Sequence, residues 1–323
     1  MSGTVLVGDV GGTHARFAVA ARAGDSGFAL TERADLNTDD FPTLAAAVRA
    51  YLGRLAAAPG AIVLAVAGPV TAGAVKFTNH AWNTSEAELR TAGFRSAMLI
   101  NDFAALAFAI ASLGEKSFRT IGPEHPGLAG ETITVLGAGT GFGVSCLARY
   151  RGRAVPLATE GGHMGFAPGT GDEVELVRTL RRRFDHVSVE RVLSGPGLEN
   201  IHTGLAELRG MTATHLPAEK IVAAAQAGDV ACRASLDMFC GIFGSVAGDF
   251  ALAHGARGGV FIGGGIAAKI EDYLETSAFR ARFEAKGRMS YFVQPIPTRL
   301  VANPDAAFLG AARAAQDYGL LDA

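Results

Sequence analysis

Charged side chains are scarce in this chain of 323 residues, in which Asp, Glu, Lys and Arg together make up 19% and the formal net charge is −2. The longest run of basic residues is Arg181-Arg182-Arg183. A protein that binds nucleic acid needs a clustered basic surface to neutralise the phosphates. We therefore expect no nucleic-acid partner, and the arginine triplet is typical of a solvated helix face.

Cysteine is rare as well. The three cysteines, Cys146, Cys232 and Cys240, are odd in number and lack the spacing of metal ligands. We interpret them as reduced, mostly buried thiols of a cytoplasmic protein. We also expect no start-of-chain signal peptide, because Val5 enters a predicted strand at once.

Two further features are missing that would mark a membrane protein or a common nucleotide-binding fold. The longest uncharged apolar stretch that we consider, residues 132–148, is interrupted by four glycines, so we expect no membrane span. A Gly-x-x-x-x-Gly-Lys-Ser/Thr loop is not present, which argues against a P-loop ATPase. The pattern Gly263-x-Gly265-x-x-Ala268 fits the loose dinucleotide motif, but it lies late in the chain and no acid follows at the expected distance. A Rossmann dehydrogenase is therefore disfavoured.

The chain is instead rich in glycine, with 42 residues, and in hydrophobic side chains, which make up 49%. This composition suits a buried α/β enzyme with Gly-rich turns, and the length allows two domains. Continuous apolar runs at 61–66 and 97–100 predict buried strands, and apolar residues at helical spacing predict helices at 43–52 and 103–113. Alternating strands and helices indicate an α/β unit, in which ligands are expected at the strand ends.

Near the start of the chain, two apolar runs at 5–10 and 16–20 are joined by a Gly-rich turn, which predicts a β-hairpin. The turn consists of Gly11, Gly12 and Thr13. Asp9 lies inside the first run, where an acid is costly unless it meets a cation or hydrogen-bond donors. An acid for Mg²⁺ beside backbone donors for phosphate is what a nucleotide site needs. The alternative is a tight hairpin in which Asp9 only satisfies the turn.

A similar pattern of strand, Gly-rich turn and strand returns 128 residues later. At this offset Leu-Val-Gly-Asp-Val-Gly-Gly-Thr overlays Val-Leu-Gly-Ala-Gly-Thr-Gly, with Gly11 on Gly139 and Asp9 on Gly137. A true repeat predicts a duplicated α/β fold with two hairpins that face one cleft, and the alternative is a chance match of short motifs. Only the first copy has an acid, so a metal-binding role would belong to that copy.

Other polar residues lie at predicted strand ends and in Gly-rich loops. Asp102, after Asn101, follows a buried strand, where it can cap the next helix or take a proton from a bound hydroxyl. Glu160 and His163 are three residues apart in a Gly-rich loop, so they can bind a metal or a polyol, or form plain surface. Glu190 can be a helix-start acid that the helix dipole favours.

Taken together, these motifs resemble those of bacterial glucokinases of the hexokinase-like, actin-type ATPase superfamily, over nearly the whole chain. The motifs that carry the resemblance are Leu-Val-Gly-Asp-Val-Gly-Gly-Thr at 6–13, Thr-Asn-His-x-Trp at 78–82, Ile-Asn-Asp-Phe at 100–103, Gly-Ala-Gly-Thr-Gly at 137–141, Glu-Gly-Gly-His at 160–163, Glu-Arg-Val-Leu-Ser-Gly-Pro-Gly at 190–197, and Gly-Gly-Val-Phe-Ile-Gly-Gly-Gly-Ile at 258–266. Each motif alone is weak, but so many in this order are specific.

The resemblance implies a role for each candidate. Asp102 would be the base for the sugar 6-hydroxyl, and Asp9 would hold Mg²⁺ through water. The residues implied at the other hydroxyls are Asn101, Glu160, His163 and Glu190, those at the phosphates are Gly11, Gly12, Thr13, Gly139 and Thr140, and those beside the adenosine are Gly264 and Gly265. The implied reaction is the ATP-dependent phosphorylation of glucose to glucose 6-phosphate.

The resemblance also implies a duplicated actin-like, ribonuclease H-like α/β fold with a cleft that closes on sugar. The small domain would be residues 1–111 with 302–323, and the large domain 112–301. The family commonly forms homodimers. Relatives usually have Asn where this chain has His14, and several have an acid where Gly165 stands. The alternative functions are a kinase that phosphorylates another hexose or an amino sugar, a kinase that uses another phosphoryl donor, and a sugar-binding regulator without turnover.

Overall fold

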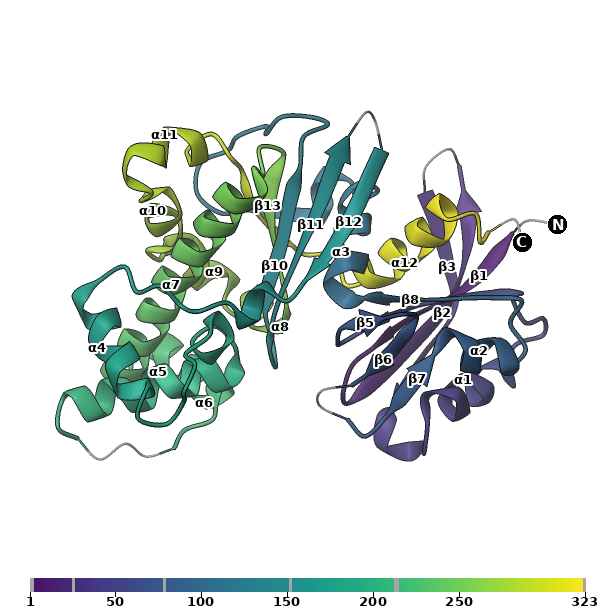
Figure 1. The fold of residues 1–323 in the computed structure, drawn as a ribbon, viewed down its shortest axis with the longest axis horizontal. Coiled ribbons are helices and arrows are strands. Elements are labelled where there is room, and N and C mark those ends of the chain that lie inside the picture. Colours follow the sequence, from purple (N-terminus) through teal and green to yellow (C-terminus); the bar gives the residue numbers. More distant parts are fainter. Residues whose placement is uncertain (1–2, 25–26, 78–79, 151–152, 212–214, 322–323) are drawn as a thin grey trace. The chain divides into compact units, whose positions relative to one another are not determined.

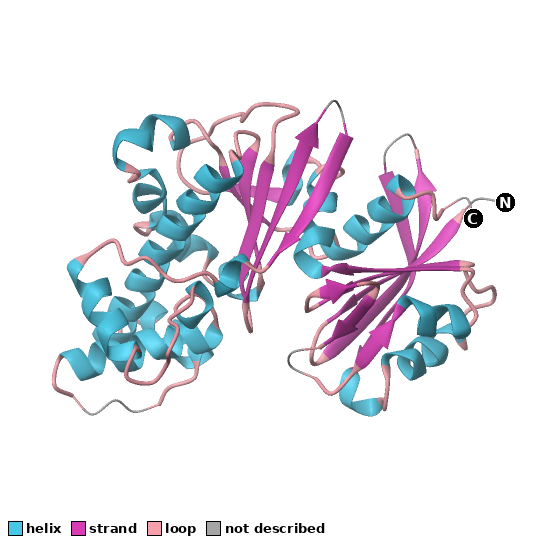
Figure 2. Cartoon of the chain, viewed as in Figure 1, coloured by secondary structure: helices cyan, strands magenta, loops and turns pink. Residues whose placement is uncertain are grey.

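The computed structural model describes residues 3–24, 27–77, 80–150, 153–211 and 215–321. This part of the chain forms a mixed α/β structure with three sheets (Figures 1 and 2). Its contacts divide it into two compact units, residues 1–117 with 303–323 and residues 118–302. We call them unit 1 and unit 2.

Unit 1 is built on a five-stranded sheet with the strand order β3-β2-β1-β4-β8. The strands are β1 (Thr4–Val10), β2 (His14–Ala23), β3 (Gly27–Asn37), β4 (Ala61–Val66) and β8 (Ser96–Asn101). β1 and β2 form the predicted antiparallel hairpin, and β1, β4 and β8 run parallel. β4 is buried along its whole length, which confirms the prediction of a buried parallel strand at 61–66.

Two short helices of unit 1 begin where a hydroxyl can cap them. The side chain of Thr43 accepts the N–H of Ala46 before α1 (Leu44–Leu52), and Ser85 accepts the N–H of Glu88 before α2 (Glu86–Thr91). Between these helices a second sheet of unit 1 contains β5 (Val70–Thr71), β6 (Ala74–Lys76) and β7 (Asn83–Ser85). Strands of two or three residues leave no periodicity in the sequence, so this sheet was not predicted.

The last helix of unit 1 packs closely against the helix that carries Asp102. These helices are α12 (Ala306–Asp317) and α3 (Asp102–Ile110), which lie side by side in Figure 1. They approach most closely at Gly310, where a Cβ atom would lie 1.8 Å from the carbonyl oxygen of Ala105. A glycine is therefore required there, and the position of α3 depends on this backbone contact.

Unit 2 is built on a six-stranded sheet with the order β12-β11-β10-β13-β14-β9. The strands are β9 (Phe118–Thr120), β10 (Ile133–Ala138), β11 (Phe142–Tyr150), β12 (Arg153–Thr159), β13 (Gly259–Gly263) and β14 (Thr298–Val301). β10 is antiparallel to β11 and parallel to β13, as β1 is to β2 and β4. Both sheets thus have the pairing that the sequence repeat predicts.

The helices of unit 2 include one that passes through its core. They are α4 (Gly171–Leu180), α5 (Gly195–Leu208), α6 (Ala218–Gln226), α7 (Val230–His254), α8 (Gly265–Lys269), α9 (Glu271–Thr276), α10 (Phe279–Glu284) and α11 (Ser290–Val293). α7 buries Phe239 and Phe243 completely, and Gly255, with φ 61°, is its C-cap.

Within the described ranges, α7 is also the helix that is long and apolar enough to cross a membrane by length and composition, with a hydropathy of 1.4. The apolar stretch at 132–148, the longest candidate for a membrane span that we consider from the sequence, lies in β10 and β11 instead. Of the most apolar window of α7, 67% is buried in the structure. Burial of this kind is typical of a core helix, which is apolar on most sides because protein surrounds it.

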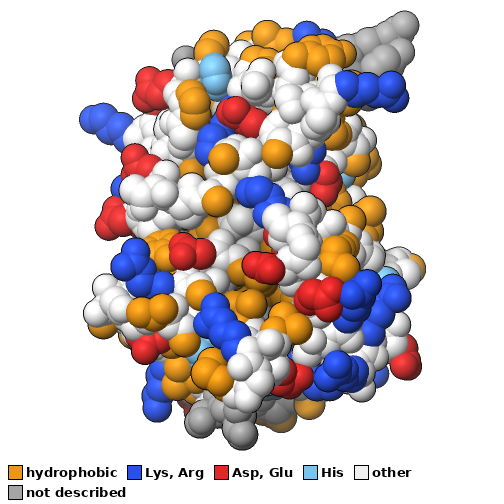
Figure 3. All heavy atoms as spheres, turned by 90° about the vertical axis from the view of Figure 1, so that its left-hand side faces the viewer, with side chains coloured by type: hydrophobic (Ala, Val, Ile, Leu, Met, Phe, Trp, Pro, Cys, Tyr) orange, Lys and Arg blue, Asp and Glu red, His pale blue; other side chains and the backbone are white. Residues whose placement is uncertain are grey.

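Charges on the surface are mixed in sign. Figure 3 shows Lys and Arg interspersed with Asp and Glu over the face in view. On this face the described side chains of neither sign form a continuous field, which fits the low net charge of −2. The expectation that no nucleic acid binds stays a prediction.

The contact at Gly310 can be tested by replacing this residue with alanine. Gly310→Ala should lower the free energy of unfolding of unit 1 by about 1–3 kcal/mol, the usual cost of overpacking, despite a gain of about 1 kcal/mol in helix propensity. Trp82 is the only tryptophan and is 3% exposed within unit 1, so its fluorescence during urea unfolding reports on this unit.

Gln316→Ala, near the end of the same helix, serves as the control and should change stability by less than about 0.5 kcal/mol. A Gly310→Ala protein as stable as the parent would show that α3 and α12 can separate without cost.

Candidate active site

The turn of the first hairpin places a carboxylate and a guanidinium together. Asp9 and Arg16 are cross-strand partners, and the Arg16 side chain donates a hydrogen bond to Asp9 Oδ2. The Asp9 side chain is 19% exposed, so this pairing supplies the cation that a half-buried acid needs. If Asp9 binds a metal, as the sequence predicts, Arg16 is part of that site, because it already bonds to one of the two carboxylate oxygens.

Hydrogen bonds to the backbone of the same turn also hold it in place. The Gly11 N–H donates to the carbonyl of His14 at 2.9 Å, and the Thr38 hydroxyl donates to the carbonyl of Gly12 at 2.8 Å. The carbonyl of Thr13 accepts the N–H of Thr38 at 3.0 Å. Thr13 remains exposed at the tip, so the turn has a fixed backbone and an accessible outer face.

The side chain of His14, next to the turn, bonds to the neighbouring strand. Its Nδ1 lies 2.9 Å from Asp35 Oδ1, and both side chains are more than half exposed. Asp35 is on β3, so His14 contacts the neighbouring strand. The structure thus gives His14 a partner of its own outside the turn.

The helix cap that the sequence analysis considered for Asp102 belongs to Asn101. Asn101 Oδ1 accepts the N–H groups of Phe103 at 2.9 Å and Ala104 at 3.2 Å. Asp102 is the first residue of α3, and its Oδ1 also accepts the Phe103 N–H at 2.9 Å. Because Asn101 already caps the helix, the cap reading of Asp102 is wrong in its main part.

Asn101 has a second contact. Its Nδ2 donates to the carbonyl of Gly68 at 3.4 Å, a long and weak bond. The amide oxygen is therefore committed to the helix, and the amide nitrogen is the group that can turn toward a ligand. The Thr-Asn-His-x-Trp motif lies in the same unit, but its Thr78 and Asn79 are outside the described residues.

His80 and Trp82 of that motif have structural roles. Trp82 is buried and donates its ring N–H to the carbonyl of Phe41 at 3.1 Å. His80 stacks edge-on against Trp82 with ring centroids 4.6 Å apart, and its Nε2 lies 3.5 Å from Asp39. The motif thus fastens the chain after β6 to the segment that precedes α1.

A pocket of about 600 Å³ lies elsewhere in unit 1, on the small sheet. Its lining residues are Pro69, Thr71, Ala74, Val75, Lys76, Asn83, Thr84, Ser85 and Glu88. None of the predicted site residues lines it. We place the candidate site at the turns of the two hairpins and at the ends of their neighbouring strands, because the predicted acids and backbone N–H donors lie at these positions.

In unit 2 the second hairpin has a shorter turn than the first. Ala138 pairs with Phe142, and the Gly139 N–H donates to the carbonyl of Gly141 at 2.8 Å. In the first hairpin the equivalent pair is Val10 with Ala15, one residue further apart. Thr140 is exposed at the tip of the second turn, as Thr13 is in the first.

The two hairpins differ in charge at the same place in the ladder. Asp9 faces Arg16 in the first, whereas Gly137 faces Gly143 in the second. The glycine at 137 is required for another reason, because a Cβ there would lie 2.2 Å from the carbonyl oxygen of Gly263. At this ladder position an acid is therefore present only in the first hairpin.

Gly264 and Gly265 lie beside the second turn. Gly264 has φ 87°, and a Cβ on it would lie 2.4 Å from the carbonyl oxygen of Ala138. α8 begins at Gly265, and both glycines are exposed. Unit 2 thus brings together the residues predicted for phosphate, at 139–140, and for adenosine, at 264–265.

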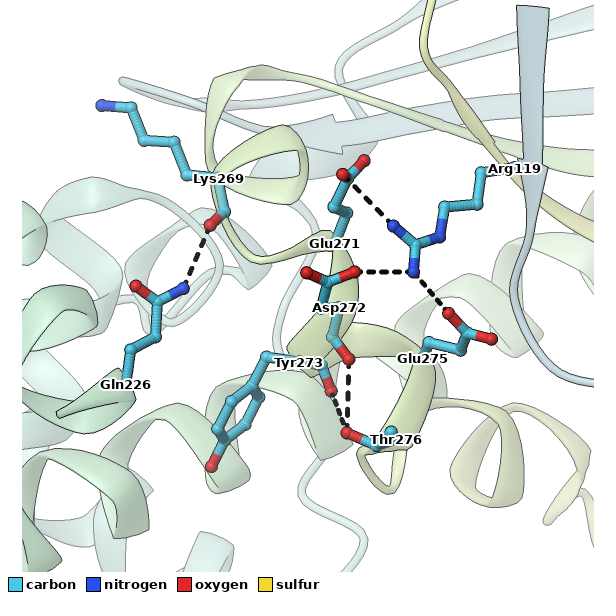
Figure 4. Close-up of polar contacts among 8 residues, drawn as sticks. All are labelled: Arg119, Gln226, Lys269, Glu271, Asp272, Tyr273, Glu275 and Thr276. Atoms are coloured by element: carbon cyan, nitrogen blue, oxygen red, sulfur yellow. Dashed lines mark hydrogen bonds and ion pairs between the residues drawn. The ribbon is translucent and has the colours of Figure 1, made fainter. Parts of the chain in front are cut away.

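The helix after α8, which is α9, is held in place by contacts of charged side chains (Figure 4). Arg119 of β9 lies against three acids of α9, with distances of 3.2 Å to Glu271, 2.7 Å to Asp272 and 2.6 Å to Glu275. Tyr273 donates to Asp237 of α7 at 2.6 Å, and burial together with this bond raises the pKa of Tyr273 to about 12. These contacts hold the chain just beyond the 264–265 turn.

Glu160 and His163 are near each other at the surface of unit 2. Their carboxylate and ring nitrogen are 3.9 Å apart, and both side chains are more than half exposed. The glycines between them are required by close packing: a Cβ on Gly161 would lie 2.7 Å from the ring of Phe250, and one on Gly162 would lie 2.1 Å from the carbonyl oxygen of Phe142. The loop is thus pressed onto β11.

Glu190 bonds to the second turn. Its Oε2 accepts the N–H of Phe142 at 2.9 Å, across 48 positions of sequence. Its segment also pairs with the Glu160 loop, because Gly165 and Ser188 form an isolated β-bridge and the Val189 N–H donates to the carbonyl of Met164 at 2.9 Å. Glu160, His163 and Glu190, the residues of unit 2 predicted to bind the sugar, therefore lie in one connected part of this unit together with the second turn. Phe142 is their common neighbour, and no sequence pattern indicates this role.

Among the described residues, no group of three or more His, Cys, Asp or Glu side chains could hold a metal ion. A Mg²⁺ ion carried on nucleotide phosphates needs only one or two protein carboxylates. Asp9 at the first turn fits such a role by its oxygen chemistry and its position at a strand end.

A family model described as "Glucokinase" matches residues 6–318 of the chain. A glucokinase from Caulobacter sp. strain K31 is 49% identical over 312 residues, which cover 96% of this chain and 94% of the relative. A crystal structure of a glucokinase from an Antarctic psychrotroph is 38% identical, has a TM-score of 0.89, and covers 98% of this chain and all of its own.

More distant structures share the fold. A Balamuthia mandrillaris glucokinase in complex with glucose is 20% identical with a TM-score of 0.77, covering 97% of this chain and 93% of its own. A ROK family glucokinase from Streptomyces griseus, in complex with glucose and AMPPNP, is 19% identical with a TM-score of 0.64, covering 98% and 100%.

The cap assignment predicts which of two neighbouring substitutions destabilises unit 1. Asn101→Ala should lower the free energy of unfolding by about 1 kcal/mol, because the Ala104 N–H loses its acceptor and the Phe103 N–H keeps only Asp102. Asn101→Asp should retain most of the stability, since a carboxylate oxygen accepts the same bonds. Asp102→Asn should change it by less than about 0.5 kcal/mol.

Urea unfolding followed by Trp82 fluorescence measures all three variants. A larger loss for Asp102→Asn than for Asn101→Ala would return the cap to Asp102.

Proposed function

Because this chain belongs to the glucokinase family, we propose that it transfers the terminal phosphoryl group of ATP to the 6-hydroxyl of D-glucose, giving glucose 6-phosphate and ADP. Family membership itself rests on the match over residues 6–318 and on relatives that cover nearly the whole chain. The chain is thus a sugar-phosphorylating enzyme, and the residue roles below are part of the proposal.

The placement of Asp102 carries the proposal. The residue stands at the end of a parallel strand of unit 1, at the first position of α3, while Asn101 supplies the helix cap. In the reaction, the Asp102 carboxylate accepts the proton of the 6-hydroxyl, the hydroxyl oxygen forms its bond to the terminal phosphorus, and the bond from phosphorus to ADP breaks.

The other hydroxyls of the sugar are held by polar side chains. Glu160, His163 and Glu190 lie in one connected part of unit 2, and their exposed or half-buried groups suit a polyol. Asn101 contributes from unit 1 through its amide nitrogen. We propose that the units act as domains that close on the sugar and exclude water. The domain bounds that the resemblance implies, 1–111 with 302–323 and 112–301, lie near the bounds of the units, 1–117 with 303–323 and 118–302.

The nucleotide is held by turns rather than by a P-loop. The phosphates meet the first turn, Gly11, Gly12 and Thr13, and the second, Gly139 and Thr140. The adenosine lies beside Gly264 and Gly265. Asp9, whose carboxylate Arg16 keeps in place, would hold Mg²⁺ through water, and the ion would neutralise phosphate charge when bound with the nucleotide. A nucleotide analogue bound by a protein of the same fold supports the use of ATP.

The fold that best accounts for both units is the duplicated actin-like, ribonuclease H-like fold. Its support is the shared pairing of the two sheets, in which an antiparallel hairpin continues into parallel strands. We also propose a cytoplasmic homodimer. Three buried, unpaired cysteines suit a reducing compartment, and the family resemblance suits the dimer.

The sugar can be identified with a panel of acceptors. Glucose should be the best acceptor in an assay that couples ADP release to an optical signal. If N-acetylmannosamine or fructose were preferred by more than about tenfold, which is about 1.4 kcal/mol of transition-state discrimination, the glucose assignment would be wrong. A protein that binds glucose and releases no ADP would instead be the sugar-binding regulator.

The role of Asp102 can be tested with Asp102→Asn. The amide can still bond the 6-hydroxyl, so calorimetry should find glucose affinity nearly unchanged. It cannot accept the proton, so kcat should fall by at least about 10²-fold, the lower end for the loss of a general base. Near-normal turnover of Asp102→Asn would remove the base role.

A further inference from the structure

We propose that Glu190 is a positioning residue for the nucleotide, in addition to its place at the sugar. Its carboxylate holds the second turn, residues 139–141, in the conformation that receives the phosphates. The inference rests on the proposed function, which assigns this turn to phosphate and Glu190 to a sugar hydroxyl. It adds that one side chain serves both ligands.

The first argument is the contact at the end of the turn. Glu190 Oε2 accepts the N–H of Phe142, the residue directly after Gly141, at 2.9 Å. The carboxylate also lies against Gly141 itself, because a Cβ on this glycine would come within 2.5 Å of Oε2. A hydrogen bond to an ionised acceptor is stronger than one between neutral groups, so it can fix the backbone there.

The second argument is that the same segment holds the start of the turn. The Gly195 N–H, at the beginning of α5, donates to the carbonyl of Gly139 at 2.8 Å. The Ser194 hydroxyl donates to the carbonyl of Glu190 at 2.8 Å and accepts the N–H of Gly197 at 2.9 Å. Residues 190–195 therefore bracket the turn at both ends.

The third argument is that Phe142 is itself immobile. Its ring is 5% exposed and packs edge-on against Phe243 of α7, with centroids 5.8 Å apart. Its carbonyl lies where the loop of Glu160 and His163 presses on β11, at Gly162. A bond to the Phe142 N–H therefore connects Glu190 to a fixed point of the core rather than to a free loop.

A carboxylate can serve both ligands at once. It has two oxygens with about four acceptor positions, and the Phe142 N–H uses one of them. Glu190 is half-buried, so part of the group faces outward. A sugar hydroxyl that bonds to this outer part leaves the bond to the turn intact and restrains the carboxylate further.

The experiment is a titration of AMPPNP with Mg²⁺ in the absence of any sugar, on the full chain. Glu190→Ala should raise the dissociation constant about tenfold or more, the effect of losing a hydrogen bond to a charged group. Glu190→Asp keeps the charge but is one methylene too short to reach Phe142, and it should weaken AMPPNP similarly. Glu190→Gln keeps an acceptor oxygen and should stay within about threefold.

Glu160→Ala is the matched control. It removes another acid of the proposed sugar set from the neighbouring loop, and Glu160 has no described bond to the turn. It should weaken glucose binding and leave AMPPNP binding within about twofold. Rescue by Glu190→Gln but not by Glu190→Asp separates a positioning bond from a general effect of charge, and thermal melting of each variant identifies any loss of fold.

Three outcomes would overturn the inference. Glu190→Ala could bind AMPPNP as the parent does, or it could bind more tightly, which would mean that the carboxylate competes with phosphate for the Phe142 N–H. Glu160→Ala could also weaken AMPPNP equally, which would mean a general effect of the loop. If the parent binds AMPPNP but phosphorylates no sugar, the proposed function fails, while the same titration still decides the role of Glu190.

Discussion

The close approach of two backbones at the carboxyl ends of β10 and β13 is the constraint on which unit 2 depends. Gly137 and Gly264 each stand where a Cβ would come within 2.4 Å of a carbonyl oxygen on the other strand end. No side chain can occupy such a space. The two Gly-rich motifs are therefore required in order to bring the 139–141 turn and the start of α8 side by side, where one can meet phosphates and the other adenosine.

The first hairpin, in unit 1, differs from the second in the charge of its side chains. At the ladder position where the second hairpin has two facing glycines, the first has Asp9 and Arg16. In this half-buried strand end, Arg16 offsets the cost of removing the Asp9 carboxylate from water. The two hairpins share a backbone pattern and differ in electrostatics, so at this ladder position only the first has a carboxylate that could hold a metal.

Much of this fold could be predicted from the sequence, because long apolar runs and cap residues act locally. The strand at 61–66, the starts of α1 and α2, and the end of α7 at Gly255 all follow from neighbouring residues. The sheet of β5, β6 and β7 was missed, because strands of two or three residues show no period. The edge strand β12 was missed as well, since Pro156 interrupts its pattern and is tolerated only at an edge. The bond between Glu190 and Phe142 spans 48 positions, and no local pattern records it.

The position of α12 has a consequence for the order in which the chain is made. Its apolar residues form a common core with Val5, Val7 and Phe108, and Gly310 lies against α3. A ribosome delivers residues 118–302 before it delivers this helix, so unit 2 is fully synthesised while unit 1 still lacks part of its core. The elements that flank Asp102, β8 and α3, therefore remain partly uncovered until α12 has been synthesised. In a nascent chain, the unit that contains the N-terminal hairpin can therefore complete its core only after the whole of unit 2 has been synthesised.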